Sequence, residues 1–336
     1  MRLKQYQGKG NVYFLIFSLL LVMFPFVYED RNLLIIFTQI FIFAIFAMSY
    51  DVLLGFTGII SFGHAMFFGI GAYSTSIFLK RFEAEMMYVI LAVIVGIVIS
   101  AAVSYIVGLL TLRLKAHFYA MLTLALANLF YVGAEKWRSL TEGADGFTFR
   151  IPEVLRDRTS FYLICLVCMI VVYFLLMRLI SSPLGKVLLA IKENEHRTES
   201  LGYNVLHYKI IASVVAGILA SVAGSLYAIS LRFVNTSVFA MDVTLDALLM
   251  TIIGGVGTVI GAIIGSGVIE FAHYGLTNLA KVHWIFERWI IFFGIVYILA
   301  VMFFPKGIVG AFQMIKERIK RKKTSQEKDE NEKLTG

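Results

Sequence analysis

Long apolar blocks separated by short polar connectors dominate the chain from residue 12 to residue 304. The hydrocarbon core of a bilayer is about 30 Å thick, and an α-helix of roughly 20 apolar residues crosses it. Most of the blocks reach that length, which core helices of soluble proteins rarely do. We therefore predict membrane-spanning helices at residues 12–28, 33–54, 58–79, 87–112, 117–134, 161–180, 209–230, 244–274 and 288–304.

The composition agrees with this pattern. Hydrophobic residues make up 59% of the chain and charged residues 15%, whereas a soluble domain is nearer half apolar and a quarter charged. The predicted fold is all-α, a polytopic transmembrane helical bundle of about ten membrane elements with glycine-rich broken helices. We assign residues 1–310 to a single transmembrane domain with a cytoplasmic loop at 181–208, and residues 311–336 to a basic, charged cytoplasmic tail.

Basic residues set the expected orientation. Arg2, Lys4 and Lys9 precede an apolar stretch that lacks a small-residue cleavage site, so we expect a retained first helix with its N-terminus in the cytoplasm. The net charge is +8, and a basic run at 316–323 follows the last block. No aromatic or folded module accompanies that run, so it indicates a cytoplasmic anchor on anionic lipid and no nucleic-acid site.

The block at 244–274 conflicts with this topology if it crosses the membrane once. A single crossing would place the basic tail outside, and about 30 helical residues would extend roughly 45 Å. Its middle contains Gly254, Gly255 and Gly257, and glycine permits tight turns. We predict a break there, with one short segment entering from outside and a second returning. Irregular backbone at membrane depth is tolerated where it is buried or lines a cavity, so this break is also a candidate translocation site.

A second glycine-rich segment occurs early, between Gly55 and Gly71. One interpretation is close helix packing alone; the other is that two interrupted segments, one in each half, flank a pathway. An ionisable group at bilayer depth costs roughly 3 kcal/mol to insert, so Asp51 and Asp246 should face protein, water or an interface. Asn128 suits either the pathway or an interhelical hydrogen bond. The candidate pathway residues are Thr57, Gly58, Ser61, His64, Asn128, Asp246, Gly254, Gly255 and Gly257.

The sequence lacks the usual motifs of an enzyme. It contains no HExxH or GxSxG motif, and Gly185-Lys186 is followed by Val187, so there is no phosphate-binding loop. Cys165 and Cys168 lie within an apolar block, where they indicate small membrane residues more than a redox or metal site. We expect no catalytic residue, no metal site and no cofactor, with any ATP bound by partner subunits.

The loop that begins at Ser182-Pro183 is the candidate contact with such partners. Leu184, Leu188, Ile191 and Glu195 recur at helical spacing after a proline that suits a first helical turn. The pattern fits either a helix lying on the lipid surface or a docking helix, and charges of both signs favour docking. We expect Leu184, Leu188 and Ile191 to fill a groove on an ATPase, with Lys192, Glu193 and Glu195 at its rim. The full set of candidate coupling residues is Leu184, Gly185, Leu188, Ile191, Glu195 and Gly202.

At these residues the chain resembles the LivM-type permeases of branched-chain amino-acid ABC importers. The resemblance extends over roughly residues 35–310, and the motifs that carry it are Asp51–Tyr73, Ser182–Asn204, Asp246–Thr258 and Phe304–Gly310. It implies a complex with a second, LivH-type permease, two cytoplasmic ATPase subunits and an extracellular or periplasmic solute-binding protein, in the cell membrane of a bacterium.

The sequence also departs from that family. Asn128 and Asp246 stand where relatives often carry Glu, and Glu142 replaces a common Gly. Permeases of urea and short-amide importers share the architecture, so the resemblance leaves two substrate classes open. An ion-coupled secondary transporter is the third alternative, and it would need a self-contained ion site for which only Asp51 and Asp246 are candidates.

Overall fold

The computed structural model describes residues 18–25, 30–114, 116–280, 294 and 307–311. Six helices in these ranges are long and apolar enough to cross a membrane, so the predicted all-α membrane bundle is confirmed. The long helices are α2 (Arg31–Thr57), α4 (Met86–Thr111), α5 (Ala116–Lys136), α8 (Arg158–Ser181), α11 (Val205–Leu231) and α13 (Val259–Ala280). The predicted span at 288–304, apart from residue 294, and most of the one at 12–28 lie outside the described residues.

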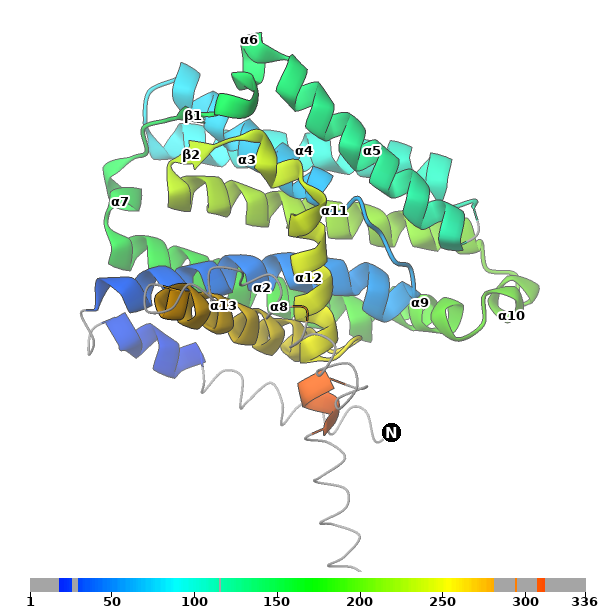
Figure 1. Cartoon of the computed structure of the whole chain (residues 1–336). Coiled ribbons are helices and arrows are strands. Elements are labelled where there is room, and N and C mark those ends of the chain that lie inside the picture. The colour runs from blue at the N-terminus through cyan, green and yellow to red at the C-terminus, as the bar shows by residue number, and fades with distance from the viewer. Residues whose placement is uncertain (1–17, 26–29, 115, 281–293, 295–306, 312–336) are drawn as a thin grey trace, which may run out of the picture.

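Shorter elements connect the long helices. They are α3 (Ala65–Arg81), α6 (Arg138–Thr141), η1 (Gly143–Asp145), β1 (Phe147–Thr148), α7 (Glu153–Arg156), α9 (Pro183–Glu193), α10 (Glu195–Ser200), β2 (Phe233–Val234), η2 (Thr236–Phe239) and α12 (Met241–Gly254). The two strands pair antiparallel, Phe147 opposite Val234. Figure 1 shows α6, α7 and this strand pair at one end of the bundle, and α9 and α10 at the other.

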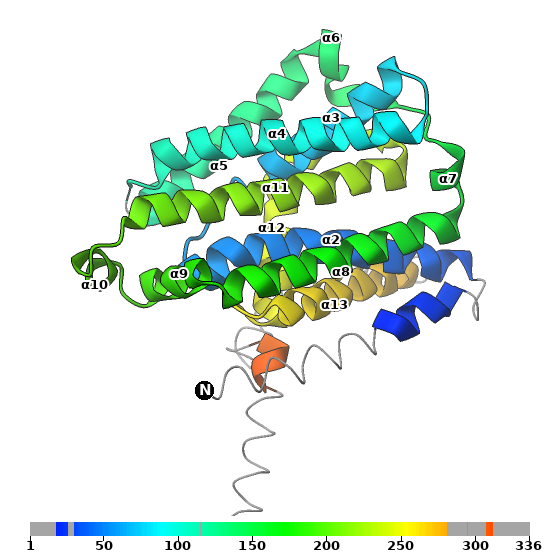
Figure 2. The same ribbon diagram turned by 180° about the vertical axis from the view of Figure 1, so that it is seen from behind.

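The helices form two layers. Helices α3, α4, α5 and α11 lie in one, and α2, α8 and α13 in the other, as opposite views agree (Figures 1 and 2). Small residues bring α11 close to its neighbours: the Ser100 hydroxyl on α4 donates to the Gly217 carbonyl at 2.7 Å. A Cβ at Gly71 would meet the Ser221 backbone, and one at Gly224 would meet the Phe68 backbone. Close packing of this kind replaces the hydrophobic effect inside a bilayer.

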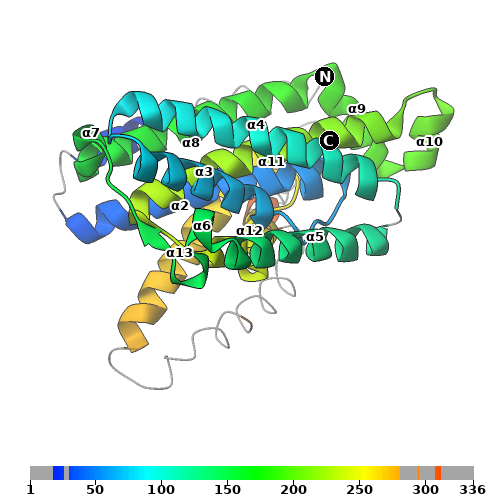
Figure 3. The same ribbon diagram turned by 90° about the horizontal axis from the view of Figure 1, so that it is seen from above.

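The predicted break in the block at 244–274 is confirmed. Helix α12 ends at Gly254, and α13 begins at Val259. Figure 1 shows α12 running between the two layers, across the direction of α2 and α11, and Figure 3 shows it nearly end-on. Helix α13 then returns toward the end that carries α7 (Figure 2). A re-entrant pair is therefore present, and its first half lies across the bundle.

The predicted span at 58–79 is wrong in its first third. Residues 58–64 are not helical, and α3 begins only at Ala65. Gly58 ends α2 in the left-handed conformation, with a φ of 73° and its N–H bonded to the Leu53 carbonyl. A residue in that conformation closes a helix and redirects the chain. An apolar pattern alone does not distinguish such an extended approach from a helix.

Candidate translocation and coupling site

The segment from Gly254 to Thr258, called here the glycine turn, joins α12 to α13 beside the C-terminal half of α2. Gly255 has a φ of 128° and Gly257 a φ of 81°, both in the region that favours glycine. The Thr258 hydroxyl donates to the Gly255 carbonyl at 2.6 Å. The Gly257 N–H donates to the Asp51 Oδ1 atom of α2 at 2.8 Å. Asp51 thus satisfies a backbone donor that the turn leaves outside any helix.

Asp51 lies inside the bundle, with a side chain that is 1% exposed. Its second oxygen, Oδ2, has no hydrogen-bond partner among the described residues. Gly55, one turn further along α2, makes room for the contact: a Cβ there would lie 2.6 Å from the Gly257 nitrogen and closer still to Asp51. The position therefore accepts only glycine without movement of the turn.

Lys192 reaches the same place from α9. Its ammonium group donates to the Gly55 carbonyl at 2.6 Å and interacts electrostatically with the Asp51 carboxylate. Its stem packs beside Gly58, where a Cβ would lie 3.3 Å from Cγ of the lysine. Lys192 is exposed, and its ammonium binds a carbonyl of this chain, while its place at the rim of a partner interface stays a prediction.

The early interruption, residues Gly58–His64, has different surroundings. His64 is 0% exposed, its Nε2 lies 2.8 Å from the Ser49 hydroxyl, and its ring stacks on Phe46 with centroids 5.3 Å apart. The Tyr50 hydroxyl donates to the Ser61 carbonyl at 3.1 Å. The polar contacts at this interruption therefore come from membrane helices α2, α5 and α12.

The structure brings some of the remaining pathway candidates together and leaves others apart. Thr57 is buried, and its hydroxyl bonds back to the Leu53 carbonyl of its own helix at 2.6 Å. Asn128 lies on an exposed side of α5. Asp246 is half-buried on α12, and its carboxylate repels that of Glu270 on α13. Sequence reasoning missed Glu270, although it is the second acid in the apolar block at 244–274.

The apolar side of α9 faces this chain. Leu188 is 0% exposed and Ile191 is 3% exposed, Leu184 is half-buried against the main core, and a Cβ at Gly185 would meet the Ile180 backbone. Helix α9 packs on α2, α8 and α11. The expectation that Leu188 and Ile191 fill a groove on an ATPase is therefore wrong, because they attach α9 to its own bundle; for the half-buried Leu184 it stays a prediction.

The other two coupling candidates lie beyond α9. Glu195 forms an ion pair with Lys209 at 2.7 Å, and Gly202 takes a φ of 89° at the end of α10 with open space where a Cβ would stand. The exposed apolar side chains near them are Leu189 at 37%, Leu201 at 72% and Tyr203 at 43%. These three residues, called here the distal patch, lie within the Ser182–Asn204 motif but were not among the candidate coupling residues.

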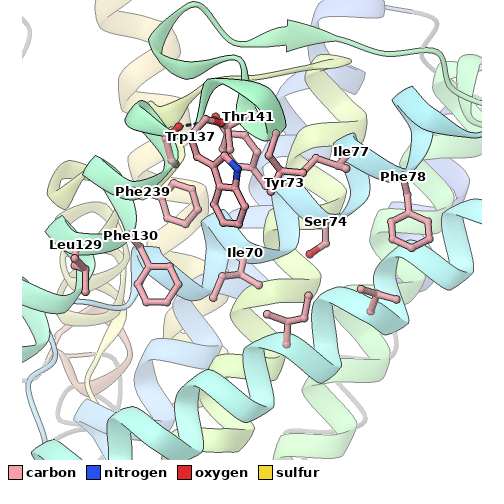
Figure 4. Close-up of a pocket in the computed structure, with 15 residues that line it drawn as sticks. Ile70, Tyr73, Ser74, Ile77, Phe78, Leu129, Phe130, Trp137, Thr141 and Phe239 are labelled. Carbon is pink, nitrogen blue, oxygen red and sulfur yellow. Dashed lines mark hydrogen bonds between the residues drawn. The ribbon is translucent and has the colours of Figure 1, made fainter.

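An apolar cavity of about 610 Å³ opens between α3, α4, α5, α6 and η2 (Figure 4). Side chains of aliphatic and aromatic residues form most of its wall. The labelled residues are Ile70, Tyr73, Ser74, Ile77, Phe78, Leu129, Phe130, Trp137, Thr141 and Phe239. Sequence reasoning did not find this cavity, because its walls come from segments distant in sequence and carry no motif.

The comparisons with known proteins all match permeases of branched-chain amino acid transport systems. A family model described as branched-chain amino acid transport system / permease component matches residues 32–302. The chain is 26% identical over 286 residues to the high-affinity branched-chain amino acid transport system permease protein LivM of Salmonella typhimurium, and equally to that of Escherichia coli. Each alignment covers 77% of this chain and 66% of the relative, so the chain spans slightly less than two thirds of their length.

A third relative comes from an archaeon. The probable branched-chain amino acid transport permease protein LivM of Methanocaldococcus jannaschii is 21% identical over 328 residues, covering 84% of this chain and 94% of that protein. No solved structure matches the chain significantly.

Proposed function

We propose, from the premise that this chain belongs to the branched-chain amino acid transport system permease family, that it is the membrane-spanning subunit of an ATP-driven importer. The sequence has no phosphate-binding loop, so hydrolysis takes place on two partner ATPase subunits. A second permease completes the pathway, and an external solute-binding protein delivers the substrate. The end with α9 and α10 faces the cytoplasm, as do both termini, in accordance with the distribution of basic residues.

The observation that carries this proposal is the α9–α10 pair beyond the ends of the long helices (Figure 1). Leu188 and Ile191 attach it firmly to the bundle, while the distal patch remains exposed among charged residues. Apolar anchors inside a polar rim are typical of protein interfaces. A partner that binds here acts on an element that is continuous with α8 and α11.

The substrate proposal rests on the apolar cavity. Its wall consists mainly of aliphatic and aromatic side chains, and such a wall suits a branched aliphatic side chain better than urea, which is polar throughout. Asp246 and Glu270, half-buried on α12 and α13, add negative charge deeper in the bundle. We therefore favour leucine, isoleucine and valine as substrates over urea and short amides.

Co-purification tests the docking surface. Truncation of an interface anchor commonly costs about 2 kcal/mol, which is roughly a 30-fold weaker complex. Leu201→Asp should therefore release the ATPase subunits, while Leu231→Asp, an exposed leucine at the other end of α11, should retain them. Retention of the ATPase by Leu201→Asp would remove the distal patch from the interface.

Uptake into proteoliposomes tests the substrate. The complete complex, with the ATPases and the binding protein, should accumulate radiolabelled leucine in the presence of ATP and should not accumulate urea. Uptake driven by a sodium or proton gradient without ATP would support the secondary-transporter alternative instead. ATP-dependent urea uptake would move the chain to the urea and short-amide importers.

A further inference from the structure

Three segments that are distant in sequence meet at one carbonyl group. The Gly55 carbonyl of α2 accepts from the Lys192 ammonium of α9 at 2.6 Å. The glycine turn lies against the same group, since a Cβ at Gly257 would be 3.2 Å from the Gly55 oxygen. Asp51, one helical turn earlier on α2, accepts from the Gly257 N–H at 2.8 Å. The cytoplasmic helix and the broken membrane helix are thus linked through one turn of α2.

We propose that Lys192 and Asp51 are positioning residues that transmit movement of α9 to the glycine turn during transport. In one state the Lys192 ammonium holds the Gly55 carbonyl, as in this structure. In the other it moves to the Asp51 carboxylate and releases the turn. The proposal rests on the proposed function, because it assigns the movement of α9 to binding and hydrolysis of ATP by the partner subunits.

The second acceptor is already in place. Asp51 is 1% exposed, and its Oδ2 has no hydrogen-bond partner in the part of the chain that the structure describes. A buried carboxylate is costly unless it is paired or hydrogen-bonded, and Lys192 is the cation that interacts with it electrostatically. Two acceptors near one flexible ammonium group give two discrete arrangements, which coupling between distant sites requires.

The surrounding contacts let Lys192 change its hydrogen-bond partner while α9 stays folded. Leu188 and Ile191 keep α9 packed on the bundle, and Gly55 leaves no side chain between Asp51 and the turn. Lys192 is therefore able to change partner without unfolding α9. Lys186 supplies a matched comparison on the same helix: its side chain is exposed and makes no hydrogen bond or ion pair within the described ranges.

A thiol on the turn reports its movement. Val256 is 39% exposed, and Val256→Cys, with Cys165 and Cys168 replaced by Ala, places a single reactive cysteine there. The complete complex is labelled with a small maleimide, with and without a non-hydrolysable ATP analogue. We expect the labelling rate to change at least about 3-fold on nucleotide binding, as a population shift of about 0.7 kcal/mol would produce.

The variants then identify the link. Lys192→Met and Asp51→Asn should each abolish the nucleotide-dependent change, while Lys192→Arg and Lys186→Met should retain it. ATPase co-purification should be unchanged in all four variants. If Lys192→Met does not accumulate in membranes, Lys192→Gln serves the same purpose.

Two results would overturn the proposal. One is a nucleotide-dependent change that persists in Lys192→Met, and the other is a reporter in the unaltered background that does not respond to nucleotide at all. Failure of the proposed function is recognised separately, because it would show as a complex that binds no ATPase and imports no amino acid.

Discussion

The two interruptions of the membrane helices differ in what holds them. The early one, Gly58–His64, is fixed inside the bundle by contacts from α2, α5 and α12. The Phe62 N–H bonds to the Thr123 hydroxyl at 3.3 Å, and the Ala65 N–H to the Thr244 hydroxyl at 2.9 Å. In the late one, the glycine turn, the Gly257 N–H bonds to the Asp51 carboxylate of α2, and Lys192 of α9 binds the Gly55 carbonyl that lies beside the turn.

This difference separates two roles for irregular backbone in a membrane protein. Buried polar groups must find partners, and a group with several internal partners is fixed in place. The early interruption has such partners, so we interpret it as a rigid support for the start of α3. The glycine turn takes its side-chain bond from Asp51, and the Gly55 carbonyl beside it binds Lys192 of α9, so we interpret the turn as the element that moves.

The sharpest way to disrupt the late interruption is to detach α9. Leu188 is 0% exposed, and Leu188→Asp would place a carboxylate in that core, which we expect to lower the free energy of unfolding by about 4 kcal/mol. The adjacent Leu189→Asp alters a side chain that is 37% exposed and should change it by less than about 0.5 kcal/mol. Thermal unfolding of the purified protein compares the two, and similar losses would contradict the assignment of Leu188 to the core.

A single methyl group tests the early interruption. A Cβ at Gly63 would lie 2.9 Å from the Thr123 carbonyl carbon, so Gly63→Ala must displace α5 and should destabilise by about 3 kcal/mol. Gly133 on α5 has nothing within 4 Å of a Cβ, and Gly133→Ala should stabilise by about 0.5 kcal/mol through helix propensity. Equal melting temperatures would show that the early interruption is not rigid.

The histidine contact should affect stability and leave turnover unchanged. Ser49→Ala leaves the Nε2 atom of a fully buried His64 without its partner at 2.8 Å, which should cost about 1.5 kcal/mol. Ser76 is equally buried but bonds only to the Ala72 carbonyl of its own helix, so Ser76→Ala should cost less. Transport per folded molecule should match in both, and a lower rate in Ser49→Ala alone would make the early interruption part of the moving machinery.

The sequence predicted the late interruption better than the early one, for physical reasons. At Gly254–Gly257 a block too long for one crossing and a charge conflict both required a break, and neither depends on tertiary contacts. At residues 58–64 the glycines allowed an interruption, but the apolar pattern continues and fitted a helix equally well. The break there depends on the close approach of Gly63 to Thr123, which only the assembled bundle reveals.

The roles of α9 residues were less predictable for a related reason. Helical spacing correctly grouped Leu184, Leu188 and Ile191 on one side, but it does not say whether that side meets a partner or the same chain. Lys192 was judged by its charge and placed at a rim, whereas its long stem lets the ammonium reach the Gly55 carbonyl. Such reach becomes evident only from coordinates.

The prediction with the smallest effect on stability compares an added methyl group in the glycine turn with one in the turn that ends α10. Gly257 and Gly202 have φ angles of 81° and 89°, so an alanine at either position should cost about 1 kcal/mol of backbone strain. They differ in surroundings: a Cβ at Gly257 would lie 3.2 Å from the Gly55 oxygen, and one at Gly202 would have nothing within 4 Å. Gly257→Ala should therefore lower ATP-dependent uptake several-fold, because the added methyl presses on the carbonyl that Lys192 holds. Gly202→Ala should lose the same stability. Because Gly202 lies between Leu201 and Tyr203 of the distal patch, ATPase co-purification is measured in parallel, and uptake should be kept where the ATPase is retained, since nothing in the described part of this chain lies within 4 Å of a Cβ there. If Gly257→Ala and Gly202→Ala showed the same unfolding free energy and the same uptake, the glycine turn would be as fixed as the early interruption. The two interruptions would then differ in sequence and not in mobility.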